Sequence, residues 1–290
     1  MTLFFKDPKF KPVYQKIMDL NDLVWEKKLD TMIIDQWLDN FHTKTEQYLM
    51  LELLSKFTYY NENEIKSLLV SAYGRLKNHI LFLALKNQTD LGDLDDFIKN
   101  NCYFVGTWEN PSKSGTHLLY NFRLLNRLPS SIFYATVKDV PYTAKFVIFL
   151  DDIAGSGRQA RDFWKDRVIN ESQHLTTTQF LYLVLVGSTK GVNYIEQKTK
   201  IKVLPIVELD ERYNLFSDSS IYYTDNKKKQ QVKKICDSYG KKLYSTASLG
   251  YDNSQLLIGF HHNVPDNTLP IIWTNKNGWN PIFQRNEGDA

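Results

Sequence analysis

The feature that most constrains the fold is a change of hydrophobic pattern near residue 100. Beyond it, short apolar runs of β-type composition occur at 102–105, 131–137, 146–150, 180–186 and 201–207. Helical stretches lie between several of them, at 118–125, 158–169 and 192–200. Strands that are apolar almost throughout are buried on both faces, as in a parallel sheet covered by helices. We therefore expect an α/β domain with a mostly parallel sheet.

The first hundred residues have helical periodicity instead. Apolar residues recur at helical spacing around 32–41, 48–57 and 65–76, and Asn61 or Asn63 could cap the last of these helices. The polar segment 87–92 is typical of a boundary. We expect a helical domain at 1–100 followed by the α/β domain at 101–290.

Composition excludes several classes of protein. A formal net charge of +3 is too small to indicate a nucleic-acid binder from overall electrostatics. Two cysteines, Cys102 and Cys236, make neither a disulfide framework nor a metal knuckle. No apolar segment approaches the length that spans a bilayer, and the first residues do not resemble a signal peptide. A cytoplasmic protein without membrane contact is the expectation.

One motif carries a specific chemistry. The apolar run 146–150 leads into segment 151–157 (DDIAGSG), and a predicted helix follows from about Arg158. In parallel α/β sheets ligands gather at the carboxyl ends of strands. Adjacent carboxylates there can bind hydroxyls, while small residues and a helix N-terminus favour an anion. A ribose 5-phosphate carries both groups.

Other interpretations of this motif remain. A strand followed by a glycine turn and a helix occurs in many folds, and a doubled Asp can cap a helix. The segment is not a P-loop, because no Gly-Lys-Ser/Thr follows it. It is not a dinucleotide fingerprint either, because no third glycine completes the pattern.

Residues 149–157 resemble the phosphoribosyl-pyrophosphate loop of type I phosphoribosyltransferases. The resemblance implies that Asp151 and Asp152 bind the ribose hydroxyls. It also implies a phosphate cradle formed by Ala154, Gly155, Ser156 and Gly157. Gln159 belongs to the same expected phosphate site, but it stands where the family commonly has a hydroxyl residue. This departure puts ordinary salvage activity in doubt.

Segment 110–115 follows the first expected strand and resembles, by position, the family's short pyrophosphate-binding loop. Lys113 would then meet a diphosphate, with Ser114 and Gly115 beside it and Gly115 opening a helix. A diphosphate would bring Mg²⁺, which binds through phosphates and few protein ligands. No protein metal cage is visible in the sequence. A solvated turn is the equal alternative for this segment.

A broader resemblance covers most of the chain. Segments 249–251, 260–263, 267–273 and 278–283 are similar to the C-terminal signature of phosphoribosyltransferase-like proteins of bacterial conflict systems. Residues 37–41 and 51–57 resemble their N-terminal winged-helix-like module. Such proteins accompany anti-phage systems, including retrons, as effectors.

The helices of residues 30–85 could bind DNA in a helix-turn-helix-like arrangement, but they carry few cationic groups that acidic residues do not match. Docking onto a protein partner, for example a reverse transcriptase with its RNA–DNA product, is therefore the expectation.

Further candidates have weaker patterns. His261 or His262 could act in acid–base chemistry or base recognition, and Trp273 could stack on a nucleobase, although packing is the simpler role. The lysines between 227 and 242 predict a solvated amphipathic helix with Val232 and Tyr239 inward. A nonspecific phosphate contact is the functional alternative for these lysines.

Two function hypotheses follow. The first is an enzyme that transfers or cleaves a bond at the anomeric carbon of phosphoribosyl pyrophosphate or a nucleotide, with Asp151, Asp152 and Lys113 as its catalytic groups. The second is a catalytically inert module that senses a nucleotide or docks onto a nucleoprotein partner. The departure at Gln159 favours the second.

Overall fold

The computed structural model describes residues 7–107 and 114–285, and for residues 114–116 only the backbone is described. The chain divides into two compact units. One combines the residues up to Glu62 with those from Glu211 onward, and the other spans Asn63–Asp210. This division differs from the expected boundary between residues 100 and 101. The long helix expected to belong to the N-terminal domain packs on a helix of the α/β unit, and the C-terminal segments share a core with the N-terminal helices.

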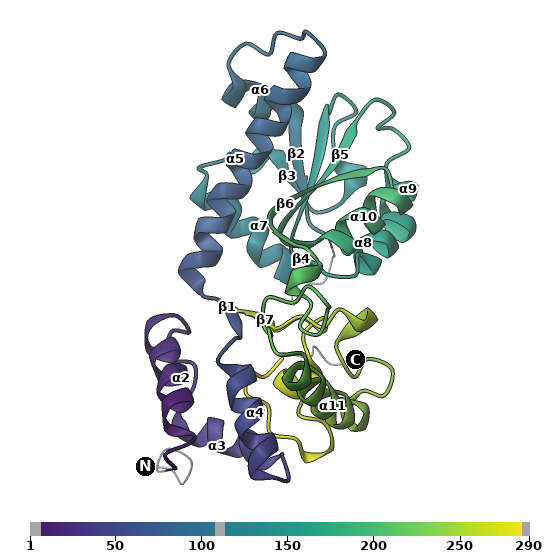
Figure 1. Ribbon diagram of the computed structural model, residues 1–290. Helices are drawn as coiled ribbons and strands as arrows, with labels where there is room; N and C mark the ends of the chain where they lie inside the picture. The colour runs from purple at the N-terminus through teal and green to yellow at the C-terminus, as the bar shows by residue number, and fades with distance from the viewer. Residues whose placement is uncertain (1–6, 108–113, 286–290) are drawn as a thin grey trace. The chain divides into compact units, whose positions relative to one another are not determined.

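The second unit is the α/β unit (Figure 1). Its strands are β2 (Cys102–Val105), β3 (Phe133–Tyr134), β4 (Phe146–Ala154), β5 (Gln179–Ser188) and β6 (Ile201–Leu209). Its α-helices are α5 (Glu62–Lys86), α6 (Leu94–Asn101), α7 (Ser114–Leu125), α8 (Arg158–Phe163), α9 (Ile169–Glu171) and α10 (Thr189–Lys198). A π-helical turn, η3 (Trp164–Val168), joins α8 to α9, and short 3₁₀ turns flank β3 at Ser130–Ile132 and Val137–Asp139.

The five strands are all parallel, in the order β3-β2-β4-β5-β6. This confirms the predicted α/β class with a parallel sheet. The strand expected over 131–137 is only two residues long, because pairing with the short β2 is limited to Phe104 with Phe133 and Val105 with Tyr134. The chain leaves β2 toward β3 on one side and later extends from β4 toward β5 on the other. The strand order therefore reverses between β2 and β4, and in such sheets the crevice at that point is where ligands bind.

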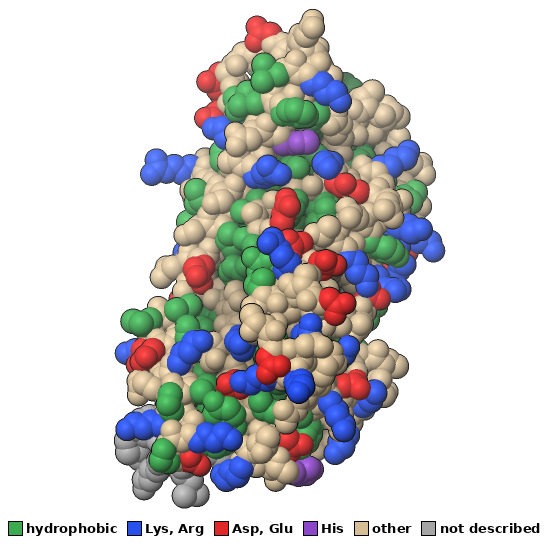
Figure 2. All heavy atoms as spheres, in the orientation of Figure 1, with side chains coloured by type: hydrophobic (Ala, Val, Ile, Leu, Met, Phe, Trp, Pro, Cys, Tyr) green, Lys and Arg blue, Asp and Glu red, His purple; other side chains and the backbone are tan. Residues whose placement is uncertain are grey.

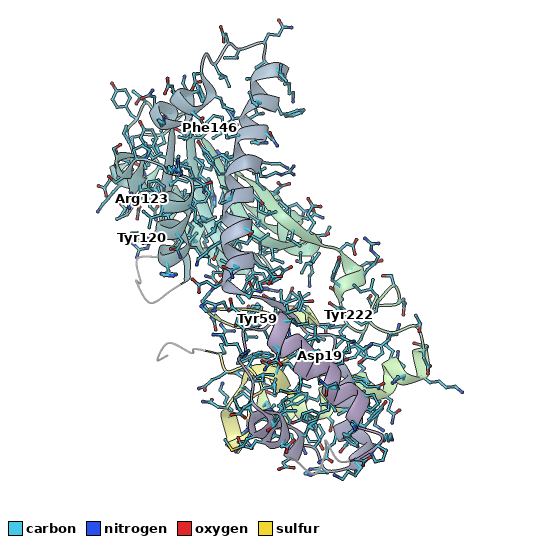
Figure 3. The ribbon with its side chains drawn as sticks, turned by 90° about the vertical axis from the view of Figure 1, so that its left-hand side faces the viewer. Asp19, Tyr59, Tyr120, Arg123, Phe146 and Tyr222 are labelled. Carbon is cyan, nitrogen blue, oxygen red and sulfur yellow. The ribbon has the colours of Figure 1, made fainter. Side chains whose placement is uncertain are left out.

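Helices cover both faces of the sheet (Figure 1). On one face, Phe163 of α8 lies against Phe149 of β4 with ring centroids 5.2 Å apart, and Ile195 of α10 belongs to the same buried cluster. On the other face, Phe122 of α7 lies 5.2 Å from Phe104 of β2. Figure 3 shows Phe146 inside this unit and Tyr120 and Arg123 on the outward side of α7. Burial on both faces explains why the strands are apolar along nearly their whole length.

The long helix α5 packs on α7 within this unit. Tyr73 of α5 lies edge-on to Phe122 with centroids 6.1 Å apart, and the Asn126 side-chain amide donates to the Leu69 carbonyl at 3.3 Å. The segment at 87–92, expected to be a domain boundary, is the connection from α5 to α6. The side-chain contacts of α5 thus assign it to the sheet.

The first unit contains α2 (Lys11–Leu23), α3 (Thr31–Asp39), α4 (Lys44–Leu54), β1 (Thr58–Tyr60), α11 (Asn226–Leu243), β7 (Ile258–Phe260) and α12 (Pro270–Trp273). Strands β1 and β7 pair in parallel although they lie about two hundred residues apart in the sequence. The Trp37 indole N–H donates to the Ile271 carbonyl at 2.7 Å, and Trp25 lies edge-on to Phe283. The N- and C-terminal segments therefore form one core. The winged-helix-like character expected for this region stays a prediction.

Helix α10 packs unusually closely against the turn that follows β4. The Ser188 hydroxyl donates to the Gly155 carbonyl at 2.5 Å and accepts from the Gly191 N–H at 2.9 Å, which caps α10. A Cβ at Gly191 would lie 2.4 Å from the Gly155 carbonyl oxygen. Gly157 has a φ of +75°, and a Cβ there would lie 2.6 Å from the Gly191 carbonyl oxygen. Glycine at both positions is therefore required for this contact.

We predict that Gly191→Ala lowers the free energy of unfolding by about 1–3 kcal/mol, because the added methyl group meets backbone atoms that cannot move independently. Gly74→Ala in α5 is the matched control, since a Cβ there meets nothing within 4 Å. It should instead stabilise the protein by about 0.5–1 kcal/mol, as alanine in a helix interior does. Urea denaturation of both variants measures the two effects, and equal stability of the two variants would contradict the packing described.

Candidate functional site

The doubled acid lies at the carboxyl end of the central strand. Asp151 and Asp152 belong to β4, and the turn at 155–157 leads directly into α8. The helical segment that starts at Arg158 continues through Glu171 without interruption. Its first N–H groups lack partners within the helix and face the same edge of the sheet as the strand end. The local order of strand, acids, small-residue turn and helix is the one that the sequence predicted.

Asp151 points into the protein and is held from two sides. Its side chain is 6% exposed, and the Tyr182 hydroxyl donates to its Oδ2 at 2.5 Å. The Asp152 N–H donates to its Oδ1 at 2.9 Å. Burial first, and the neighbouring Asp152 second, raise the pKa of Asp151 to about 8. At neutral pH one proton is therefore retained at this buried carboxyl.

Asp152 is also buried, at 9% exposure, and it is the more exposed of the pair. In the turn, Ser156 is partly exposed, whereas Gly155 and Gly157 are covered by the first turn of α10. The Ser156 hydroxyl accepts from the Arg158 N–H at 3.3 Å. Gln159 lies exposed in the first turn of α8. A ligand approaching the turn would therefore meet Ser156 and the start of α8 before it met the glycines.

The second expected loop comes between two described elements, β2 and α7. It follows β2, which neighbours β4 across the point where the strand order reverses. Lys113 lies outside the described residues. Ser114 and Gly115 begin α7, and their side chains are not described. The assignment of Lys113, Ser114 and Gly115 to a diphosphate therefore stays a prediction.

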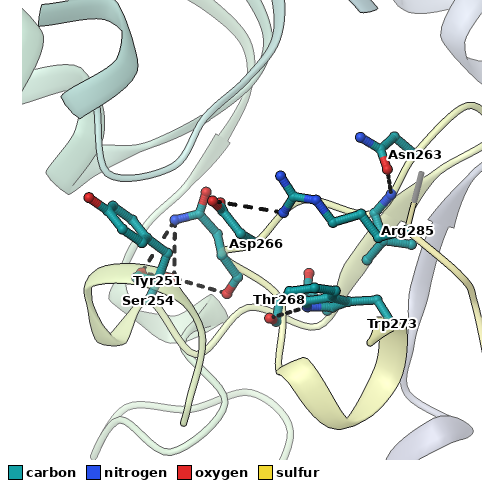
Figure 4. A network of polar contacts seen from close by, with 9 residues as sticks. Tyr251, Ser254, Asn263, Asp266, Thr268, Trp273 and Arg285 are labelled. Carbon is teal, nitrogen blue, oxygen red and sulfur yellow. Dashed lines mark hydrogen bonds and ion pairs between the residues drawn. The ribbon is translucent and has the colours of Figure 1, made fainter. Parts of the chain in front are cut away.

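The two histidines and Trp273 belong to the first unit. The Nδ1 of His261 lies 3.2 Å from Glu26 Oε2, and the His262 ring stacks on Phe260. The Trp273 indole N–H donates to the Thr268 carbonyl at 2.9 Å, and the Arg285 guanidinium lies over its ring at 5.2 Å (Figure 4). Trp273 is 4% exposed, which fits the packing role. Their nearness to the doubled acid stays a prediction.

The lysine-rich helix has the inward face that the sequence predicted, with Val232 and Tyr239 buried in α11. Several of its lysines make contacts within the first unit. Lys229 is buried and donates to the Ser217 carbonyl at 2.8 Å, while Lys228 lies 2.6 Å from Glu52. These contacts reduce the positive charge available to nucleic acid phosphates.

Sequence reasoning missed two parts of the site. Tyr182 reaches Asp151 from the neighbouring strand, and the only signal was a phenol within the apolar run at 180–186. Ser188 and Gly191 buttress the turn from α10. Their signal was the small-residue segment 187–191 (GSTKG) directly after a strand.

A family model, PRTase-CE, matches residues 34–285. The chain belongs to the PRTase-CE family. The match covers parts of both compact units, so the family extends beyond the sheet that carries the doubled acid. Comparison with curated proteins gave no significant match. Membership supports a phosphoribosyltransferase-like protein with a ligand of the phosphoribosyl or nucleotide type.

The described parts of the PRTase-CE chain contain neither a metal-binding cluster nor a membrane-spanning helix. Residues 7–107 and 114–285 contain no cluster of three His, Cys, Asp or Glu side chains that could hold a metal ion. No helix within those ranges has the length and apolarity to cross a bilayer.

The raised pKa of Asp151 predicts a specific pH dependence of stability. The pKa of Asp151 is ordinarily 3.8 and is about 8 in the folded protein. At a pH between these two values, the carboxyl is ionised in the unfolded chain but keeps its proton in the folded one. The unfolded state then binds fewer protons, so the free energy of unfolding falls as pH rises through this window. Asp151→Asn lacks this contribution. Its stability relative to the wild type should increase steadily from about pH 4 to pH 8 in urea denaturation.

Tyr182→Phe tests the raised pKa of Asp151 by removing a hydrogen bond that the carboxyl accepts. The Tyr182 hydroxyl lowers the pKa of Asp151, so its removal should raise that pKa and extend the pH-dependent loss of stability to higher pH. A stability difference between Asp151→Asn and the wild type that does not change with pH would show that Asp151 is ionised in the folded protein.

Proposed function

We propose that the α/β unit binds a ribose 5-phosphate-containing ligand, such as phosphoribosyl pyrophosphate or a nucleotide, and acts at its anomeric carbon. The observation that carries the proposal is the position of the DDIAGSG segment. Its first four residues end the central strand β4 at the point where the strand order reverses, and its last three form the turn that leads into the N-terminus of α8. Membership of the PRTase-CE family supports the same ligand class.

In this proposal the two acids have different tasks. Asp152, the more exposed carboxylate, would accept hydrogen bonds from the ribose hydroxyls. Asp151 would position Asp152, because both of its oxygens are already engaged, by Tyr182 and by the Asp152 backbone. The N–H groups of the turn and of the first turn of α8, together with Ser156 and Gln159, would bind the 5-phosphate.

The proposed reaction breaks the bond between the anomeric carbon and its leaving group, either a diphosphate or a nucleobase. The electron pair of that bond departs with the leaving group. A nucleobase nitrogen or a water molecule forms the new bond and loses a proton. The transition state carries positive charge on the sugar, and fixed hydroxyl contacts would hold it in line with the nucleophile. Lys113 would stabilise the departing diphosphate.

A Mg²⁺ ion is part of the proposal for a diphosphate ligand. Mg²⁺ is commonly bound by one or two carboxylates together with substrate phosphates, so a three-residue protein cage is not needed. Asp152 fits such an ion as its one carboxylate, whereas Asp151 keeps its proton at neutral pH and is engaged by Tyr182 and the Asp152 N–H. The ion would neutralise charge on the leaving diphosphate.

Asp152→Asn tests the ribose contact. Loss of a charged acceptor should weaken the binding of phosphoribosyl pyrophosphate by about tenfold or more in calorimetry, and the Asp151/Asp152 double Asn variant should lose turnover. Asp162→Asn on α8 is the matched control, since this carboxylate is 44% exposed and pairs with Arg161. Unchanged binding in Asp152→Asn would remove the proposed site.

An inert nucleotide-sensing or docking module is the second candidate function. Two observations favour it: Asp151 is already satisfied within the protein, and an exposed Gln159 stands where a hydroxyl residue is expected. Calorimetry with phosphoribosyl pyrophosphate and nucleotides, followed by an assay for released diphosphate or base, distinguishes the two. Binding without product supports the sensor, and any turnover that depends on Asp152 supports the enzyme.

The proposed biological role is that of an effector in anti-phage defence, acting with a reverse transcriptase and its RNA–DNA product. The resemblance of the segments between 249 and 283 to conflict-system proteins supports this role. A reverse transcriptase gene beside the gene for this chain, and co-purification of the two proteins, are the expected observations. A role through the first unit would leave the α/β unit free to bind its ligand.

A further inference from the structure

A groove of about 500 Å³ lies within the α/β unit, away from the segment 151–159. It crosses the edge strand β6 between α5 and α10. Its volume is within the range of small-molecule sites, and polar and apolar side chains line it. The same face in Figure 2 shows basic, acidic and hydrophobic side chains close together over the second unit.

Helix α10 separates this groove from the turn after β4. Thr189, Val192 and Glu196 of α10 line the groove, at a spacing that puts them on one side of the helix. Gly191 and Ile195 lie on another side, against Gly157. The groove is therefore a different place from the proposed ribose phosphate site, although one helix contributes to both.

One face of α5 supplies most of the recognition groups. Arg75, Asn78, His79 and Phe82 follow one another at positions i, i+3, i+4 and i+7, and all of them line the groove. From Arg75 to Phe82 the helix rises about 10 Å. Such a row presents a guanidinium at one end and an aromatic ring at the other.

The two ends suit different chemical groups. Phe82 exposes 61% of its surface, which is a large apolar plane for a side chain outside the core. Arg75 is exposed and has no hydrogen-bond or ion-pair partner among the described residues. Guanidinium groups bind phosphate with paired hydrogen bonds, and aromatic rings stack on nucleobases.

The centre of the groove offers neutral polar groups. Burial, then Lys202 and Arg75, lower the pKa of His79, so its ring is neutral at pH 7 and can both donate and accept. The side-chain amides of Asn78 and Asn193 have the same double capacity. Groups of this kind recognise the donor and acceptor edges of a base.

Neither acidic residue of the groove, Glu196 or Glu208, forms an ion pair with Arg75. Glu196 is engaged by Lys202 at 2.7 Å and by the Val203 N–H at 3.0 Å. Glu208, exposed near the end of β6, can accept hydrogen bonds from sugar hydroxyls or exocyclic amino groups. An anion, hydroxyls and an aromatic plane in one ligand would satisfy all of these groups.

We infer that the groove between α5, α10 and β6 is a second ligand site, and that it takes a nucleoside monophosphate. The base stacks on Phe82, the amides of Asn78 and Asn193 contact its edge, and the phosphate binds Arg75. Glu208 receives the sugar hydroxyls.

Calorimetry of the full chain with adenosine, guanosine, cytidine and uridine 5′-monophosphates, each titrated separately, tests the inference. At least one should bind with a Kd below about 1 mM. Arg75→Gln and Phe82→Ala should each weaken that binding by about tenfold, because one removes a charge-assisted phosphate contact and the other a stacking contact. Both side chains are exposed, so folding should be unaffected, and circular dichroism checks this.

Two matched controls make the result specific. Arg123→Gln removes a half-buried arginine of α7 that lies over Tyr120, outside the groove, and should leave nucleotide binding unchanged. Because the proposed ribose phosphate site can also take a nucleotide, the titrations are repeated in an Asp152→Asn background, where the binding that Arg75→Gln and Phe82→Ala weaken should remain. The matching nucleoside without phosphate should bind more weakly and should not respond to Arg75→Gln.

The inference is overturned by either of two results. One is the absence of binding by all four nucleotides up to several times that concentration. The other is binding that is lost in Asp152→Asn but kept in both Arg75→Gln and Phe82→Ala, which would assign the nucleotide to the turn after β4. The second result would leave the proposed ribose phosphate site standing, so the two proposals fail separately.

Discussion

The close backbone contact between the turn after β4 and the first turn of α10 is the constraint on which the α/β unit depends. Ser188 joins the two elements through one hydroxyl, which donates to Gly155 and accepts from Gly191. The contact requires glycine on both sides, because a Cβ on either would overlap backbone atoms of the other. The turn is therefore fixed by a neighbouring helix as well as by its own strand and helix.

The two aspartates that precede the turn, Asp151 and Asp152, differ in their surroundings. Asp151 is enclosed by β5 and accepts from the Tyr182 hydroxyl, so it contributes little to the surface of the site. Its cost of burial is reduced by retention of a proton and by two hydrogen bonds. In the proposed function, the neighbouring Asp152 is the carboxylate that meets the ligand. An acidic pair that looks symmetrical in the sequence is asymmetric in the folded chain.

The same helix contributes to both proposed ligand sites. One side of α10 supports the turn through Gly191 and Ile195, and another side lines the groove over β6. The edge strand itself is protected from further pairing by Pro205, which lacks an N–H, and by Glu196, which accepts from the Val203 N–H. An edge protected in this way leaves room for a small ligand without exposing a pairing surface to another strand.

Sequence alone determined the class of the fold and the local order of the motif. Apolar strands with helices between them specify a covered parallel sheet, and DDIAGSG after five apolar residues specifies acids, turn and helix in succession, because both depend on local pattern. Only the tertiary structure decided that α5 belongs with the sheet, that the C-terminal segments complete the N-terminal core, and that Tyr182 and Gly191 shape the site. These features join residues distant along the chain, such as Trp37 with Ile271 and Asp151 with Tyr182, and local periodicity contains no information about which distant surfaces will pack together.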